Sequence, residues 1–120
     1  MTSAISGEGK STFILGLASS IARQRKKVLV IDADLRCPSL HEPFGLNNHS
    51  GMTNFLEGEV ERPLIQQVSM LGERIDLITS GTNTDDSVKL LNSYRFKDFI
   101  EKQKETYDFI LVDSPPVIGM

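Results

Sequence analysis

The residues best suited to chemistry lie in a glycine-rich run near the start of the sequence, residues 4–11 (AISGEGKS). A small residue, four further residues and then Gly-Lys-Ser is the spacing of a phosphate-binding P-loop, although Ala4 replaces the usual first glycine. Glycines let backbone N–H groups approach a phosphate closely, and a helix starting near Ser11 adds the positive end of its dipole. Lys10 would contact the β- and γ-phosphates, whereas a glycine-rich turn without a ligand is the alternative. The predicted nucleotide-binding residues are Ser6, Gly7, Glu8, Gly9, Lys10, Ser11 and Thr12.

Two further candidates, Asp32 and Asp34, follow the apolar run 28–31 (VLVI). Alternate residues of an extended chain point the same way, so both carboxylates can face a bound phosphate while Ala33 faces away. Two carboxylates at a strand end could divide metal binding and base catalysis between them. The alternative is a helix cap or a surface ion pair with Arg36.

The third acidic candidate is Asp113, which follows the apolar run 109–112 (FILV) and has the Walker B form. A turn aspartate before Pro115 is the alternative. Three acids at two strand ends, together with a P-loop lysine, have one joint explanation. They predict a bound Mg²⁺-nucleotide used for phosphoryl transfer or hydrolysis.

The elements that must position these residues alternate between helix and strand. Apolar residues at helical spacing and short apolar runs predict an α/β fold, with a mostly parallel sheet flanked by helices. The expected helices cover 11–25, 85–91 and 94–104, with short helical pieces near 40–44 and 53–56, and the expected strands cover 28–31, 64–70, 75–79 and 109–112.

Length and composition restrict the class of protein. A chain of 120 residues with 39% hydrophobic residues predicts one globular domain. A net charge of −3 argues against a protein that coats nucleic acid, and no apolar run approaches the length of a membrane span. The single cysteine, Cys37, excludes an internal disulfide and a structural zinc site and fits a reducing, cytoplasmic compartment.

Three segments carry a resemblance to a known family: SAISGEGKST, VLVIDADLRCPSLHEPFGL and YDFILVDSPP. In this order they resemble the Walker A, Walker A′ and Walker B motifs of the bacterial tyrosine kinases of capsule and exopolysaccharide synthesis. That family lies within the MinD/ParA-like group of P-loop ATPases. Partition-type members usually carry an additional lysine where this chain has Ile5, which favours the kinase branch.

The resemblance implies an ATP- and Mg²⁺-dependent non-specific protein-tyrosine autokinase. Residues 1–120 would be a single, partial kinase domain that lacks the C-terminal strands of the sheet. Phosphorylation would pass between subunits of a homo-oligomer at the inner face of the cell membrane. A membrane-embedded polysaccharide co-polymerase, or chain-length regulator, would control it. By this resemblance the catalytic residues are Lys10, Asp32 and Asp34, with Asp32 as the base, and the Mg²⁺ ligands are Ser11, Asp34 and Asp113.

The sequence departs from that family in its tyrosines. It contains only Tyr94 and Tyr107, without the C-terminal tyrosine cluster that such kinases phosphorylate. Both are expected to pack on amphipathic surfaces rather than to accept phosphate. Two alternatives therefore stay open: an ATPase switch of the MinD/ParA kind, and an inactive truncated remnant.

Overall fold

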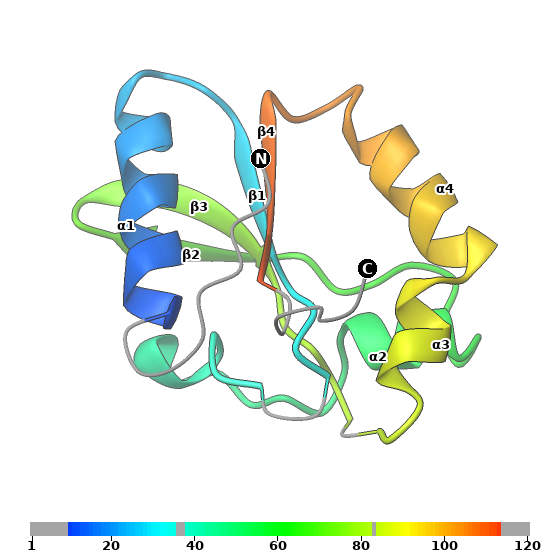
Figure 1. Ribbon diagram of the computed structural model, residues 1–120. Helices are drawn as coiled ribbons and strands as arrows, with labels where there is room; N and C mark the ends of the chain where they lie inside the picture. The colour runs from blue at the N-terminus through cyan, green and yellow to red at the C-terminus, as the bar shows by residue number, and fades with distance from the viewer. Residues whose placement is uncertain (1–9, 36–37, 83, 114–120) are drawn as a thin grey trace.

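The computed structural model describes residues 10–35, 38–82 and 84–113, with side chains from Phe13 onward. A central sheet separates α1 from the helices α2, α3 and α4 (Figure 1). The elements in chain order are α1 (Lys10–Arg23), β1 (Val28–Asp32), the 3₁₀ helix η1 (Glu42–Phe44), α2 (Met52–Leu56), β2 (Gln66–Met70), β3 (Glu73–Ile78), α3 (Ser87–Leu91), α4 (Tyr94–Gln103) and β4 (Phe109–Asp113).

The sheet has the strand order β2-β3-β1-β4. β1 pairs in parallel with β3 and with β4, whereas β2 pairs antiparallel with β3 through a tight hairpin. Because β1, β3 and β4 run in the same direction, their last residues, Asp32, Ile78 and Asp113, lie at the same end of the strands, which we call the carboxyl end of the sheet. The opposite end, where Val28 and Phe109 begin β1 and β4, is the amino end. The predicted mostly parallel α/β sheet is confirmed, and the hairpin is its antiparallel part.

Helix α1 covers one face of the sheet. Its residues Ile14, Leu15 and Ala18 recur on one side of the helix and are buried against strand residues such as Val30 and Leu77. A short connection leads from α1 into the amino end of β1, so α1 runs antiparallel to β1. The first turn of α1 therefore lies at the carboxyl end of the sheet (Figure 1).

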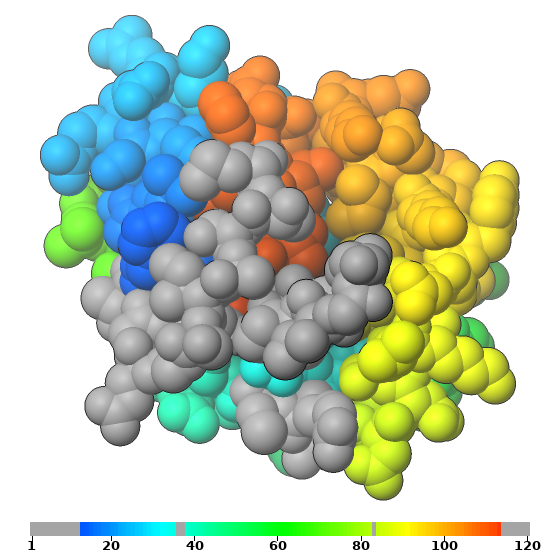
Figure 2. Space-filling model, viewed as in Figure 1, coloured from blue at the N-terminus to red at the C-terminus, as the bar shows by residue number. Residues whose placement is uncertain are grey.

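Helices α2, α3 and α4 lie on the opposite face (Figure 1), and in Figure 2 the surfaces of α3 and α4, in yellow and orange, lie on the other side of the molecule from α1, in blue. Leu29 and Ile31 of β1 point to this side and are fully buried. The rings of Phe55 in α2 and Phe99 in α4 meet with centroids 5.2 Å apart. Since β1 is covered on both faces, all five of its residues are buried, which explains the uninterrupted apolar run at residues 28–31.

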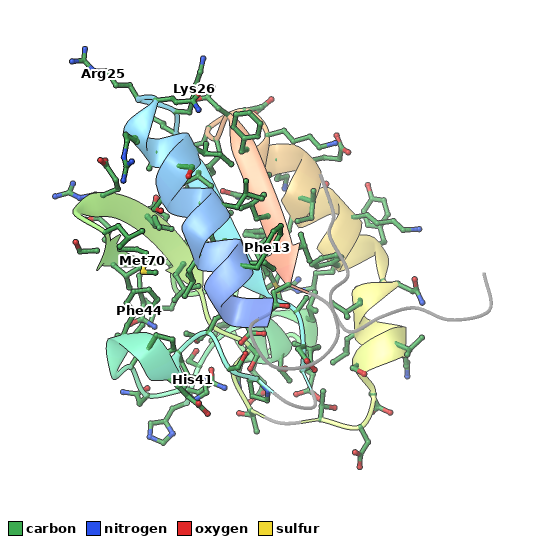
Figure 3. All side chains as sticks on the ribbon, turned by 60° about the vertical axis from the view of Figure 1, so that its left-hand side comes forward. Phe13, Arg25, Lys26, His41, Phe44 and Met70 are labelled. Carbon is green, nitrogen blue, oxygen red and sulfur yellow. The ribbon has the colours of Figure 1, made fainter. Side chains whose placement is uncertain are left out.

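The amino end of the sheet is surrounded by exposed cations. Arg25, which has a positive φ of 65°, and Lys26 extend outward just beyond α1 (Figure 3). Arg23 lies 4.0 Å from Glu73 at the hairpin. Within the described ranges, none of the helices combines the length and apolar character required to cross a membrane.

Candidate active site

Asp32 and Asp113 lie side by side at the carboxyl end of the sheet. They are the last residues of β1 and β4, and the parallel register pairs them directly. The backbone continues this pairing, because the N–H of Ala33 donates to the carbonyl of Asp113 at 2.8 Å. Both aspartates are completely buried. Two acidic side chains predicted from separate apolar runs are thus brought together by strand pairing.

The Asp32 carboxylate holds the chain that follows β1. Its Oδ1 accepts a hydrogen bond from the N–H of Asp34 at 3.1 Å. Its Oδ2 accepts from the N–H groups of Ser39 and Leu40, each at 3.1 Å. Both oxygens therefore satisfy backbone donors, and Asp32 fixes the path of the segment that leads from β1 to Leu40.

Burial raises the pKa of Asp32 to about 7. The backbone hydrogen bonds from Leu40, Asp34 and Ser39 oppose this shift because they stabilise the carboxylate, whereas the charge of Asp113 adds to it. A carboxyl group with a pKa near neutrality exchanges a proton readily at physiological pH, as a general base must.

Asp34 does not share the environment of Asp32. β1 ends at Asp32, so the alternation expected from an extended strand does not reach Asp34. Asp34 is partly exposed, whereas Ala33, expected to face away from the site, is completely buried. The structure thus separates a buried acid at the strand end from a more accessible acid two residues later.

The predicted phosphate-binding residues fall mostly outside the described residues. Ser6, Gly7, Glu8 and Gly9 belong to the part of the chain that the structure does not describe, and for Lys10, Ser11 and Thr12 it describes only the helical backbone. That backbone forms the first turn of α1, at the carboxyl end of the sheet (Figure 1). Since free N–H groups make a helix N-terminus attractive to anions, this end combines a positive dipole with two buried acids.

The available donors suit Mg²⁺ rather than a transition metal. Asp32, Asp34 and Asp113 offer only oxygen atoms, which Mg²⁺ prefers, and magnesium commonly takes one or two carboxylates together with substrate phosphates. Across residues 10–35, 38–82 and 84–113, no group of three His, Cys, Asp or Glu side chains forms a ready-made metal site. The donor set therefore fits an ion held jointly by the protein and a nucleotide.

A polar network that sequence analysis did not predict joins residues 48–54 to residues 79–82 at the carboxyl end of the sheet, and we call these two segments the wall. Asn48 donates to the Gly81 carbonyl at 2.9 Å and accepts from the Gly81 N–H at 2.8 Å. Asn54 accepts from the Gly51 N–H at 3.0 Å and donates to the Thr82 hydroxyl at 3.1 Å. Residues 48–54 are thereby joined to the segment that follows β3. In the sequence, the asparagines and glycines indicated only turns in this region. Their hydrogen bonds join residues about thirty positions apart, and such contacts leave no periodic pattern.

This wall also contacts the segment that follows β1. The first N–H groups of α2 donate to the carbonyls that follow β3: Met52 to Thr79 at 2.8 Å, and Thr53 to Ser80 at 2.7 Å. The Thr84 N–H donates to the carbonyl of Leu35 at 3.4 Å. Backbone from three segments, those that follow β1, begin α2 and follow β3, is therefore joined by hydrogen bonds at the carboxyl end of the sheet.

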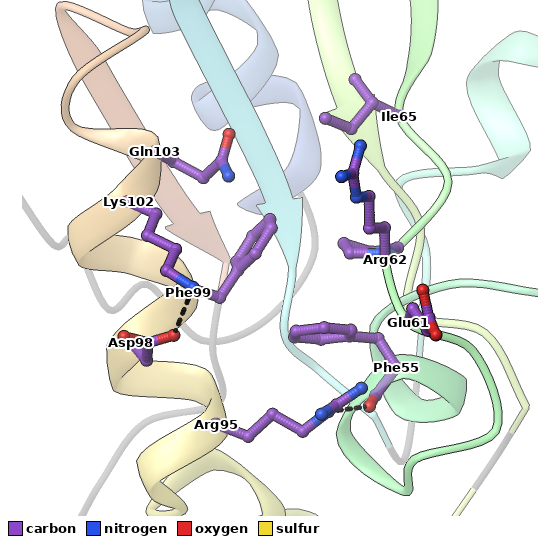
Figure 4. A pocket seen from close by; sticks show the side chains of 10 residues that line it. Phe55, Glu61, Arg62, Ile65, Arg95, Asp98, Phe99, Lys102 and Gln103 are labelled. Carbon is purple, nitrogen blue, oxygen red and sulfur yellow. Dashed lines mark hydrogen bonds and ion pairs between the residues drawn. The ribbon is translucent and has the colours of Figure 1, made fainter.

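A well-defined hollow lies elsewhere, between α4 and the segment that leads into β2 (Figure 4). Its volume is about 490 Å³. Arg95 stacks on the Phe55 ring at 4.3 Å and donates to the carbonyls of Phe55 and Val60 at 2.6 and 2.9 Å. Lys102 pairs with Asp98 at 3.1 Å. The hollow contains none of the predicted site residues.

Comparisons with known proteins add a family to this geometry. A family model described as "AAA domain" matches residues 3–120. Tyrosine-protein kinase YwqD of Bacillus subtilis (strain 168) is 38% identical over 120 residues, which cover 100% of this chain and 50% of that protein. The chain therefore spans half the length of this relative.

Solved structures agree with this assignment. The kinase domain of Escherichia coli tyrosine kinase ETK aligns with a TM-score of 0.85 and 31% identity, over 100% of this chain and 47% of that one. The cell division ATPase MinD of Pyrococcus furiosus aligns with a TM-score of 0.71 and 23% identity, over 98% of this chain and 51% of that one, and so shares the fold. The chain thus belongs to the AAA domain family, and the resemblance of its motifs to those of bacterial tyrosine kinases is confirmed.

Proposed function

We propose that residues 1–120 form the nucleotide-binding part of a bacterial protein-tyrosine kinase. It would transfer the γ-phosphoryl group of ATP to a tyrosine hydroxyl. The observation that carries the proposal is the in-register pair of buried acids, Asp32 and Asp113, at the sheet end where α1 begins. The similarity to YwqD and to the ETK kinase domain supports the choice of tyrosine as acceptor.

The chemistry of each site residue suits it to a separate role. The glycine-rich run 6–9 and the first turn of α1 would hold the phosphates, with the Lys10 ammonium against the β- and γ-phosphates. Ser11, Asp34 and Asp113 would supply oxygen ligands to Mg²⁺. When bound, Mg²⁺ neutralises charge on the phosphates and stabilises the charge that develops on the leaving oxygen.

Asp32 is the proposed base. Its pKa of about 7 lets it take the proton of the incoming tyrosine hydroxyl near neutral pH. The tyrosine oxygen then forms a bond to the γ-phosphorus while the bond from that phosphorus to the oxygen bridging to the β-phosphate breaks, leaving ADP. The hydrogen bonds from Ser39 and Leu40 keep the carboxylate at the strand end during this step.

Partner and location are part of the same proposal. The resemblance to the polysaccharide-associated kinases favours a homo-oligomer that acts at the inner face of the cell membrane. There a membrane-embedded co-polymerase would control it, and the wider role would be in capsule or exopolysaccharide synthesis. Co-purification of the chain with a membrane fraction containing such a regulator, lost when the regulator is removed, is the expected result.

The test of the kinase proposal is phosphoryl transfer to a random Glu–Tyr copolymer. The purified chain is incubated with labelled ATP and Mg²⁺, beside Lys10→Met and the matched control Lys26→Met. Lys26 is exposed at the opposite end of the sheet, so its loss should leave transfer intact. We expect transfer by the wild type and by Lys26→Met but not by Lys10→Met. Release of inorganic phosphate without labelling of the copolymer would indicate an ATPase switch, and neither reaction would indicate an inactive chain.

A further inference from the structure

The two tyrosines of this chain have opposite environments. Tyr107, just before β4, is partly buried, and its hydroxyl donates to Oδ2 of Asp76 at 2.6 Å. Burial, then the hydrogen bond to Asp76 and the charge of that carboxylate, raises the pKa of the Tyr107 phenol above its ordinary value. The proton of Tyr107 is thus held by a neighbour, and its oxygen is poorly placed to attack a phosphate. The expectation that Tyr107 packs into the fold is confirmed.

Tyr94 does not pack, contrary to the sequence-based expectation. It is 81% exposed, the largest exposed fraction among the large hydrophobic residues that the structure describes. The expectation of packing was wrong because α4 presents Phe99 to the core and turns its first residue toward solvent. With respect to the described residues, the Tyr94 hydroxyl makes no hydrogen bond.

The backbone beneath Tyr94 is nevertheless fixed. Ser93 caps α4: its hydroxyl accepts a hydrogen bond from the N–H of Phe96 at 3.3 Å and donates to the carbonyl of Leu90 at 2.6 Å. Arg95, the next residue, is anchored to the carbonyls of Phe55 and Val60. Tyr94 is therefore an accessible phenol on a well-held helix start, and no local unfolding is needed to present it.

Topology puts this phenol at the chemically relevant end of the sheet. α4 follows β3 and returns the chain to the amino end of β4, so its first residue lies toward the carboxyl end, as do Asp32 and Asp113 (Figure 1). In Figure 2 the surface of α3 and of the start of α4, in yellow, forms an outer part of the molecule. Nearby charges also suit a phosphorylated product. Lys97 is three residues further along the helix, and Asp98 is paired with Lys102 at 3.1 Å.

We propose that Tyr94 is the phosphate acceptor within this chain. The inference rests on the proposed function, because it takes the phosphoryl group from ATP bound at the carboxyl end of the sheet. The Tyr94 oxygen forms a bond to the γ-phosphorus, the bond from that phosphorus to the bridging oxygen breaks to release ADP, and the phenolic proton passes to the base. The phosphotyrosine then stands at a helix N-terminus, where negative charge is favourable.

The test measures labelling of the chain itself and of a Glu–Tyr copolymer in the same reactions. Wild type, Tyr94→Phe and the matched control Tyr107→Phe are each incubated with labelled ATP and Mg²⁺. After trypsin digestion, mass spectrometry separates the peptide 90–95, which contains Tyr94, from the peptide 105–120, which contains Tyr107. Tyr94→Phe removes only an exposed hydroxyl, so its fold should be unchanged.

We expect Tyr94→Phe to lose nearly all self-labelling while it labels the copolymer as the wild type does. In Tyr107→Phe and in the wild type, the phosphate should be on the peptide 90–95. Copolymer labelling together with undiminished self-labelling of Tyr94→Phe, or phosphate on the peptide 105–120, would overturn the inference and leave the kinase proposal standing. Absence of label from both chain and copolymer would overturn both.

Discussion

The two ends of the sheet differ in how their polar and charged groups are placed. At the carboxyl end, polar groups are buried or partly buried and hydrogen-bonded to backbone: Asp32 to three N–H groups, and Asn48 and Asn54 to the segment after β3. At the amino end, Arg25, Lys26 and their neighbours are exposed. Buried polar groups are costly unless their partners are in place, so the carboxyl end must keep one geometry. The amino end is free to vary, because water solvates its charges.

This difference teaches where to look for chemistry in the molecule. A ligand site needs donors and acceptors whose positions survive thermal motion, and the carboxyl end provides them through backbone contacts from several segments. The exposed charges of the amino end contribute little to stability individually. Four predictions can break or sharpen the comparison, beginning with the one of largest expected effect.

The largest effect should come from the pH dependence of Asp32. Its folded-state pKa of about 7 lies above its ordinary value of 3.8, so the folded protein keeps a proton that the unfolded chain releases. The resulting stabilisation is complete below about pH 4 and is lost as the pH rises toward about 7, a change of up to about 4 kcal/mol. Urea unfolding of the ligand-free protein at several pH values would measure it. Because Asp32→Asn lacks the titrating group, its stability should fall less over this range, and parallel pH profiles for the two proteins would contradict the burial described here.

The second-largest change in the free energy of unfolding should follow Gly51→Ala. A Cβ at position 51 would lie 2.1 Å from the Thr79 carbonyl oxygen and 2.6 Å from the Gly81 nitrogen, both backbone atoms of the wall. Relieving such overlap requires the backbone to move, and we expect a loss of about 3 kcal/mol in the free energy of unfolding.

Gly16→Ala is the matched control for Gly51→Ala. A Cβ at position 16, on α1, would meet no described atom within 4 Å other than the backbone of its own helix. Since alanine favours a helix over glycine, the control should gain about 0.5–1 kcal/mol. Equal stabilities for the two variants in chemical denaturation would show that the wall is looser than its hydrogen bonds indicate.

At the amino end the greatest loss should follow Tyr107→Phe. This change removes the hydrogen bond to the Asp76 carboxylate, and we expect a cost of about 1 kcal/mol because the pair is only partly buried. Thermal unfolding of Tyr107→Phe beside Tyr94→Phe isolates the contribution, since Tyr94 has no such partner among the described residues. If Tyr94→Phe lowered the unfolding temperature and Tyr107→Phe left it unchanged, the environments described here for the two tyrosines would be contradicted.

The smallest effect should follow Lys26→Gln. Lys26 is exposed at the end of α1, and its replacement should change the free energy of unfolding by less than about 0.5 kcal/mol. Calorimetric unfolding is sufficient to measure this. A loss comparable to that of Gly51→Ala would remove the distinction between the two ends.

Sequence reasoning predicted the elements well because each carries a repeating signal. Helix 11–25 and strand 28–31 correspond to α1 (Lys10–Arg23) and β1 (Val28–Asp32), and strand 109–112 gains Asp113 as its last residue. The expected strand at 64–70 is shorter at its start, where Leu64 and Ile65 are exposed outside β2. Boundaries shift in this way because a strand ends where its partner ends, and no local pattern records the partner.

The site was predictable in its residue types and less so in its environment. Asp32 and Asp113 were identified because each follows an apolar run, and the sheet topology then pairs them. The contacts of Asn48 and Asn54 could not be predicted, since they join segments far apart in sequence through single side chains. The exposure of Tyr94 was also missed, because an aromatic residue at a helix start has the same sequence signature whether it packs or not.

The most direct test of the central claim is Mg²⁺-dependent binding of a fluorescent ATP analogue to the purified chain. The claim is that the carboxyl end of the sheet is a magnesium-nucleotide site. We predict saturable binding that requires Mg²⁺, is weakened by about a hundredfold in Lys10→Met, which removes a charge-assisted phosphate contact, and is unchanged in Lys26→Met. Asp113→Asn should reduce the dependence on Mg²⁺. Folded protein that binds no nucleotide, or binds it equally well with Lys10→Met, would contradict the account.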